Sequence, residues 1–175
     1  MKSKYFLGGL FVLLGVLWIV GATHFLITDV FPVQLQDPLA WAQQVYFPAS
    51  SVSTILYLGF LLAWVFYSYN SRFTSSSKAK TTITFWLLLF IAAIVSNIIA
   101  LVMCIQFITV VGSSTQQFLG GGTFVNIPPY EFLIPLTVVN GLLLFWLPSC
   151  FLTQRTLRFI PPLSYELTTT LTGKR

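Results

Sequence analysis

Charged residues are scarce in this sequence. Only 7% of its 175 residues are Asp, Glu, Lys or Arg, whereas 56% are apolar and 17% are aromatic. Soluble domains carry about 25% charged residues. Together with a mean hydropathy of +0.85, this composition excludes a water-soluble enzyme and indicates a protein whose solvent is a lipid bilayer.

Chemically reactive side chains are scarce as well, with four acidic residues, one His and two Cys in the whole sequence. One His and two separated Cys do not make a zinc site. Cys104 and Cys150 fall at opposite depths of two apolar runs, which excludes a disulfide between them. A charge inside an apolar run would indicate an ion-coupled transporter or a voltage sensor, and the sequence has none there.

Four apolar runs are present instead, at residues 5–27, 52–69, 83–111 and 132–152. About 20 helical residues cross the ~30 Å hydrocarbon layer. The sequence therefore predicts an all-α fold, in which residues 1–175 form a single bundle of four transmembrane helices and 154–175 a cytoplasmic tail. Pro148 lacks an amide hydrogen and predicts a kink in the last helix. The first run exceeds the apolar part of a cleavable signal peptide, so we expect an uncleaved anchor helix.

The basic residues predict the orientation of these helices. All nine flank the first span at its start, the second-to-third connection, or the end of the fourth span; they are Lys2, Lys4, Arg72, Lys78, Lys80, Arg155, Arg158, Lys174 and Arg175. The other two connections carry only acidic charges. By the positive-inside rule both termini are cytoplasmic, or on the equivalent side of an organelle membrane. Topology thus explains the net charge of +5, and we expect no nucleic-acid partner.

Two segments outside the spans have patterns of their own. Asp37-Pro38 is typical of a helix start, and residues 39–47 then predict a short outer interfacial helix that Pro48 ends. An irregular aromatic loop is the alternative. At the other end of the chain, the spacing of Arg155 and Arg158 places both on one side of a helical extension, where they contact lipid headgroups. The tail beyond them is either disordered, which the sequence slightly favours, or docked on a partner.

Polar and small residues inside the spans predict helix contacts. Asn97 and Asn140 fall at matching depths of the third and fourth spans, so we expect a hydrogen bond between their amides; a polar ligand site is the alternative. Small residues allow helix backbones to approach closely. They recur in two stripes, one of Ala92, Ser96 and Ala100 and the other of Gly8, Gly15 and Ala22.

His24 is the one candidate for binding a cofactor. A single His can ligate a haem or chlorophyll, although a locally hydrogen-bonded interfacial His is the more ordinary interpretation. Contact with lipid or pigment is compatible with the many phenylalanines, and the sequence requires no cofactor.

By elimination, the sequence predicts a non-catalytic accessory or structural subunit of a larger membrane assembly, not an enzyme. Its partners would be membrane lipids and other integral membrane subunits, in a bacterial inner membrane or an organelle membrane such as the thylakoid. Two alternatives stay open. One is a small channel or carrier for a neutral or hydrophobic solute, lined by Asn97, Asn140, Gln106 and His24. The other is a lipid-modifying enzyme with an outer-face site formed by Asp29, Asp37, Glu131 and His24.

Overall fold

The structure is a computed structural model that describes residues 2–25, 42–70, 76–114, 130–153, 157 and 159–172. Most of these residues are helical, and none of them forms a strand. In chain order the helices are α1 (Lys2–Phe25), η2 (Ala42–Tyr46), α3 (Phe47–Asn70), α4 (Ser76–Ser114), α5 (Tyr130–Gly141), η3 (Leu142–Trp146), α6 (Leu147–Leu152) and α7 (Ser164–Thr172). The all-α prediction is therefore confirmed.

Three helices of the described part are long and apolar enough to cross a membrane: Gln43–Asn70, Thr81–Ile108 and Leu133–Leu152. They correspond to the second, third and fourth runs of the sequence. A shorter apolar helix, Lys4–Ile19, corresponds to the first run. The molecule is thus consistent with an integral membrane protein.

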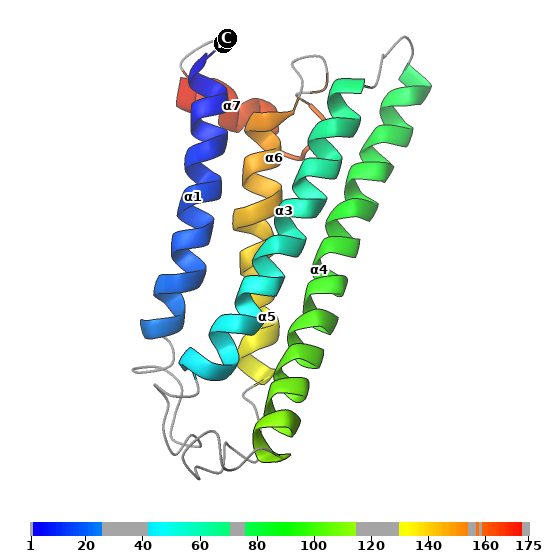
Figure 1. Ribbon diagram of the computed structural model, residues 1–175. Coiled ribbons are helices and arrows are strands. Elements are labelled where there is room, and N and C mark those ends of the chain that lie inside the picture. Colours follow the sequence, from blue (N-terminus) through cyan, green and yellow to red (C-terminus); the bar gives the residue numbers. More distant parts are fainter. Residues whose placement is uncertain are drawn as a thin grey trace.

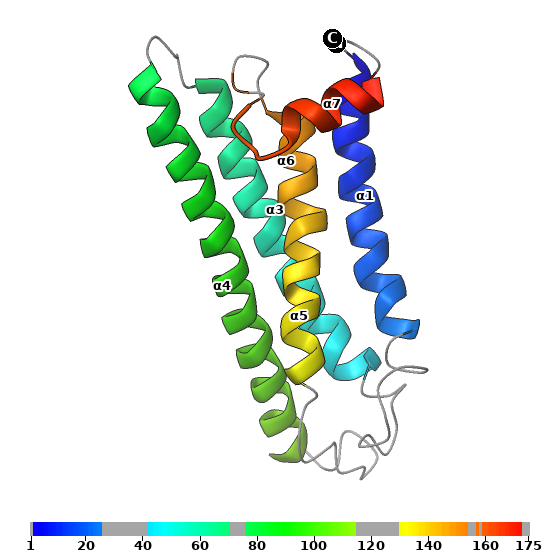
Figure 2. The ribbon, with the colours of Figure 1, turned by 180° about the vertical axis from the view of Figure 1, so that it is seen from behind.

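The long helices lie side by side along one axis (Figures 1 and 2). The start of α1, the end of α3, the start of α4 and the end of α6 lie at the same end of the bundle, where α7 lies across it. We call this the α7 end. The main contacts join α3 to α4, and α1 to α6 and η3, so α1 and α4 lie on opposite sides of the bundle.

The helix that contains α3 begins earlier than the sequence predicts. It is continuous from Ala42 to Asn70, and Pro48 lies within its first turns. The prediction that Pro48 ends a separate surface helix is therefore wrong. The turn before this proline is a π-helix, η2. Because a wider turn separates the proline ring from the preceding carbonyls, the chain continues through Pro48. Asp37 and residues 39–41 lie outside the described residues.

In the last long helix a π-helical turn likewise precedes a proline, Pro148. A π-helical turn, η3, ends two residues before this proline, as η2 ends two residues before Pro48. The amide of Leu147 donates to the carbonyl of Leu142, five residues back. Proline has no amide hydrogen and its ring would clash with the carbonyl of Leu144 in a regular α-helix. The irregularity predicted at Pro148 thus takes the form of a π-helical turn.

The described part of the C-terminal segment packs against the helices of the same chain. Leu157 and Ile160 are buried in the core, and α7 packs against α6 and α1. The amide of Ser164 donates to the carbonyl of Pro161 at 3.0 Å, which closes the turn that starts α7. The sequence slightly favours a disordered tail, and for residues 159–172 this prediction is wrong. Two buried apolar side chains hold this segment.

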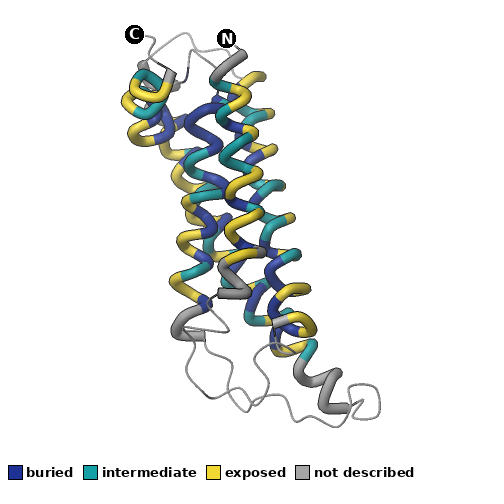
Figure 3. The backbone as a smooth tube through the Cα atoms, turned by 90° about the vertical axis from the view of Figure 1, so that its left-hand side faces the viewer, coloured by how far each residue is buried: buried dark blue, intermediate teal, exposed yellow. Residues whose placement is uncertain are grey.

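The buried residues form a band through the interior of the bundle (Figure 3). They divide into two clusters. The aromatic cluster, toward the α7 end, consists of Ile19, Tyr57, Leu61, Trp64, Trp86, Ala93, Leu144, Phe145, Leu157 and Ile160. The second cluster, toward the opposite end, consists of Val45, Tyr46, Ala49, Leu101, Ile105 and Leu133.

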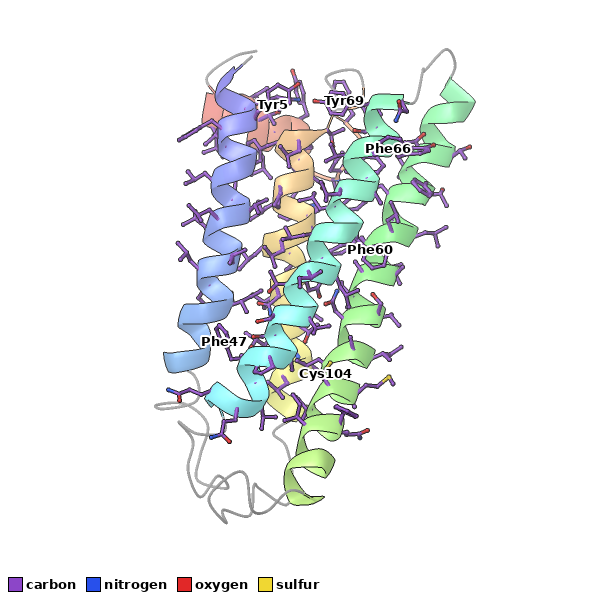
Figure 4. All side chains as sticks on the ribbon, viewed as in Figure 1. Tyr5, Phe47, Phe60, Phe66, Tyr69 and Cys104 are labelled. Carbon is purple, nitrogen blue, oxygen red and sulfur yellow. The ribbon has the colours of Figure 1, made fainter. Side chains whose placement is uncertain are left out.

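Large apolar side chains also cover the outside of the bundle (Figure 4). Phe66 of α3 and Phe107 of α4 are examples of exposed rings. At the α7 end, the hydroxyl of Tyr69 donates to that of Tyr5 at 2.8 Å and joins α3 to α1. An apolar exterior of this kind suits a lipid environment.

Candidate functional site

Buried polar side chains separate the two apolar clusters. This polar layer consists of Ser50 and Ser53 of α3, Asn97 of α4, and Thr137 and Asn140 of α5, all of which are at most 4% exposed. On each helix the layer stands between members of the two clusters. On α4, for example, Asn97 lies one turn from Ala93 of the aromatic cluster and one turn from Leu101 of the second cluster.

The three helices are in close contact at the level of this layer. The hydroxyl of Tyr57 on α3 donates to the carbonyl of Thr137 on α5 at 2.7 Å. A Cβ atom on Gly141 would lie 3.2 Å from a side-chain carbon of Ile94 and 3.2 Å from the Tyr57 hydroxyl. Asn140 adjoins Gly141, and Asn97 follows Ile94 by three residues, a rise of about 4.5 Å. Both amides therefore belong to this level.

The amide oxygens of the layer lack hydrogen bonds. Among the described residues, the buried side-chain nitrogen and oxygen atoms without a partner are Oδ1 of Asn97 and Oδ1 of Asn140. The other end of the Asn97 amide is satisfied, because its Nδ2 donates to the carbonyl of Ala93 at 2.7 Å. Unpaired buried polar atoms are rare in folded proteins. They make the polar layer the strongest candidate for a binding site.

The hydrogen bond that the sequence predicts between Asn97 and Asn140 is not formed. Such a bond needs one of the amide oxygens as its acceptor, and neither oxygen has a partner. Both residues are nevertheless buried between helices. Matching depth in the membrane brings two side chains to one level, but the rotation of each helix and the rotamer of each amide decide whether they bond.

A second polar set, at the α7 end, is linked by hydrogen bonds. The indole of Trp64 on α3 donates to the hydroxyl of Thr153 at 2.8 Å, and the indole of Trp86 on α4 donates to the hydroxyl of Ser149 at 3.2 Å. Both hydroxyls donate in turn to carbonyls of their own helix, at Ser149 and Trp146. We call these four side chains the indole network. They tie α3 and α4 to α6.

Lys4 adds a charge to the same end. Its ammonium group donates to the carbonyl of Thr153 at 2.6 Å. Thr153 is the residue at which α6 ends. The last carbonyls of a helix have no intrahelical donor and carry partial negative charge, so a Lys at this position stabilises them. The sequence suggested only a topological role for Lys4.

The rings around the indole network are also in contact. The centroids of Trp86 and Phe90 are 5.5 Å apart, and Phe145 lies 5.7 Å from Phe90 and 6.0 Å from Trp86. Offset aromatic pairs at these distances contribute about 0.5–1.5 kcal/mol each beyond their burial. The α7 end of the bundle is therefore held by both rings and hydrogen bonds.

The two predicted stripes of small residues have different roles. A Cβ atom on Gly8 would lie 2.6 Å from Leu152, and one on Gly15 would lie 2.6 Å from Leu144. Both glycines thus allow α1 to approach α6 and η3 closely, as predicted. On α4, by contrast, Ala92 is exposed, and the other members of that stripe, Ser96 and Ala100, are only half-buried. That stripe borders the buried face of α4 and does not form it.

Several predicted site residues lie outside the part that the structure describes. These are Asp29, Asp37, Arg155 and Arg158, together with the side chains of Ala22, His24 and Glu131. Gln106 is described and is exposed on α4, so it does not belong to the polar layer. The structure thus brings together two of the four residues expected to line a carrier, Asn97 and Asn140.

Both cysteines are free thiols, as the sequence predicts. Cys150 is buried, and Cys104 lies half-buried in the part of α4 far from α7 (Figure 4). Among the described residues, no cluster of His, Cys, Asp and Glu could hold a metal ion.

Comparison with known proteins gives no relative. No model of a known protein family matches the chain, and no significant match is found among curated proteins or among solved structures. The geometry of the molecule is therefore the basis for any proposal about its function.

The sequence analysis missed the indole network. Trp64 and Trp86 lie near the basic ends of their apolar runs, and Ser149 and Thr153 lie four residues apart near the basic end of theirs. An indole N–H in a membrane helix needs an acceptor. Hydroxyls at matching depth on a third helix were the signal that could have identified this network.

Proposed function

We propose that the chain crosses the membrane four times, with its α7 end on the cytoplasmic or equivalent side. Two findings support this topology. The 24 residues of α1 span about 36 Å at 1.5 Å per residue, and α1 lies beside the three longer apolar helices (Figure 1). The helix ends that adjoin all nine basic residues gather at the α7 end.

Labelling of introduced cysteines tests this topology. The native thiols are first removed by Cys104→Ala and Cys150→Ala, and single cysteines are then introduced as Lys78→Cys or Asp37→Cys. In sealed, oriented vesicles we expect a membrane-impermeant maleimide to label the two positions from opposite sides. Labelling of both from the same side would exclude four spans with this orientation.

Within the membrane, we infer a role as a non-catalytic accessory or structural subunit of a larger assembly. The outward face of α4 carries this inference. It presents a continuous apolar surface over five turns, formed by Leu87, Leu88, Ile91, Val95, Ile99, Met103 and Phe107. The Ala92 stripe runs beside it, with Ala92 exposed and Ser96 and Ala100 half-buried. Small residues next to larger apolar ones favour close contact with another membrane helix.

Purification in a mild detergent, followed by mass spectrometry, tests the accessory role. We expect an integral membrane protein to co-purify in a fixed ratio with the wild-type chain. Ala92→Phe should abolish this association, whereas the matched control Leu14→Phe, on the exposed face of α1, should preserve it. A chain that purifies alone, or an association that Ala92→Phe leaves unchanged, would contradict the proposal.

A second candidate function is a carrier for a small neutral solute. The unpaired amide oxygens of Asn97 and Asn140 favour it, since an uncharged solute that enters a membrane protein needs hydrogen-bonding groups to replace water. Stopped-flow light scattering of proteoliposomes in urea or glycerol gradients measures such transport. Equal permeability of vesicles with the wild type and with Asn97→Leu would exclude it.

A further inference from the structure

We propose that the polar layer binds a small uncharged hydrogen-bond donor, of which water is the smallest, between Oδ1 of Asn97 and Oδ1 of Asn140. This site would supply the solute-binding position of the carrier proposed above. Binding is measured without transport, so the binding proposal and the carrier proposal can fail separately. It is also independent of the accessory role, because its residues face the interior of the bundle.

The first step of the argument is the cost of an unpaired acceptor. Both amide oxygens are inaccessible to solvent and have no donor among the described residues. A carbonyl removed from water without a replacement hydrogen bond loses free energy, and the surrounding bilayer offers no donor to restore it. Two such oxygens at one level of the bundle indicate that a donor from outside the chain completes the site.

The second step is that three neighbouring donors already have acceptors of their own. The hydroxyl of Tyr57 donates to the carbonyl of Thr137, and the hydroxyl of Thr137 donates to the carbonyl of Leu133 at 2.8 Å. The Nδ2 group of Asn97 donates to the carbonyl of Ala93. Rotating this amide by 180° would place two oxygens against each other at Ala93. Oδ1 of Asn97 is therefore fixed as an acceptor.

The third step is the charge of the occupant. The side-chain ligands of the layer are hydroxyls and amides, which are neutral, and its residues include no carboxylate. A metal cation usually takes six or more oxygens and charged ligands, whereas two free amide oxygens are present here. A water molecule donates two hydrogen bonds, one to each of two acceptors. The layer therefore fits an uncharged donor.

Nuclear magnetic resonance of the full chain in deuterated detergent micelles tests the proposal directly. We expect the side-chain amide protons of Asn97 to show a nuclear Overhauser effect to long-lived water. Asn140→Leu should abolish this signal, because the site then has one acceptor, and leucine is close to asparagine in size. The matched control Gln106→Leu makes the same chemical change on the exposed face of α4 and should leave the signal intact.

A parallel sample that contains protonated urea or glycerol distinguishes the two sources of the donor. A contact to water alone identifies a hydration site, and a contact to the solute that Asn140→Leu removes identifies a solute site. Absence of contacts to water and to both solutes in the folded wild type would overturn the proposal. The same holds for a contact that Asn140→Leu leaves unchanged.

A double-mutant cycle gives a second, independent test. If one bound molecule joins the two amides, Asn97→Leu and Asn140→Leu should each lower the midpoint of unfolding in a detergent titration, and the double variant should lose no more than the worse single variant. If the oxygens are simply unpaired, each leucine should raise the midpoint and the two shifts should add. The second result would overturn the proposal.

Discussion

The indole network and the polar layer are both buried sets of polar side chains, and they are satisfied in different ways. In the indole network the N–H groups of Trp64 and Trp86 have hydroxyl acceptors. In the polar layer two amide oxygens have no donor in the part of the chain that the structure describes. Both sets come from the same three long helices, so the choice of helices does not explain the difference.

The chemistry of the side chains explains it. A hydroxyl donates to a carbonyl of its own helix and still accepts a hydrogen bond from a neighbouring indole, as Ser149 does. An amide oxygen only accepts, so it depends on a donor from elsewhere. The hydroxyls and indoles of the network satisfy one another, whereas the two amide oxygens of the polar layer have no donor among the described residues. The first arrangement stabilises the bundle and the second leaves binding capacity.

The largest expected effect is at the centre of the indole network. Trp86 is 2% exposed, and Trp86→Ala removes both its packing and its hydrogen bond to Ser149. We expect the free energy of unfolding, measured by detergent titration, to fall by about 3–5 kcal/mol. Trp18→Ala is the matched control, since Trp18 is 44% exposed on α1. Equal losses for the two variants would show that the network does not stabilise this end.

The contact of α1 with the α7 end offers the next largest effect. A Cβ atom on Gly8 would lie 2.6 Å from Cδ2 and 2.8 Å from Cγ of Leu152, whereas one on Gly9 would have no neighbour within 4 Å. Gly8→Ala should therefore destabilise the bundle by about 1–3 kcal/mol through overpacking. Gly9→Ala should be neutral or slightly stabilising. The same titration measures both, and a harmless Gly8→Ala would indicate that α1 is only loosely attached.

A smaller effect isolates one hydrogen bond of the network. Ser149→Ala leaves the indole of Trp86 without its acceptor, and we expect a loss of about 0.6–2 kcal/mol in unfolding free energy. Ser96→Ala is the control, because the hydroxyl of half-buried Ser96 donates only within its own helix. In addition, the fluorescence of Trp86 should shift in Ser149→Ala alone. If both serine variants lose the same stability, the interhelical bond contributes nothing beyond a local one.

Much of the fold could be predicted from the sequence, because helices in a membrane are specified by long apolar runs. The sequence predicts the third span at residues 83–111, and α4 extends over Ser76–Ser114. The close contacts at Gly8 and Gly15 were predicted from their spacing and from the absence of a side chain. These are properties of one helix at a time.

The remaining features depend on several helices together. The sequence predicts that a helix ends at Pro48, because the effect of proline is judged from one helix alone, whereas a π-helical turn lets the helix continue. The hydrogen bond predicted between Asn97 and Asn140 is absent, because it depends on the rotamer of each amide. Neighbouring carbonyls such as that of Ala93 influence that rotamer. The order of the C-terminal segment depends on Leu157 and Ile160 finding space among other helices.

The smallest expected effect concerns how the α7 end is closed. Leu163 has a φ of 63°, in the left-handed region that residues other than Gly, Asn and Asp seldom adopt. Pro162 precedes it, and the amide of Ser164 donates to the carbonyl of Pro161, so the segment resembles a type II turn, which favours glycine at this position. The side chain of Leu163 is 60% exposed and contributes little burial.

Leu163→Gly removes this strain at the cost of greater freedom in the unfolded chain, so we expect a net gain of less than about 1 kcal/mol. Because the amide of Leu167 donates to the carbonyl of Leu163 at 2.9 Å, slower hydrogen exchange at Leu167 reports this gain locally. Leu171→Gly, at an exposed position inside α7, should instead speed exchange, since glycine lowers helix stability by about 1 kcal/mol. If Leu163→Gly also speeds exchange, the leucine side chain holds α7 in place, and its contact with lipid outweighs the strain of the turn.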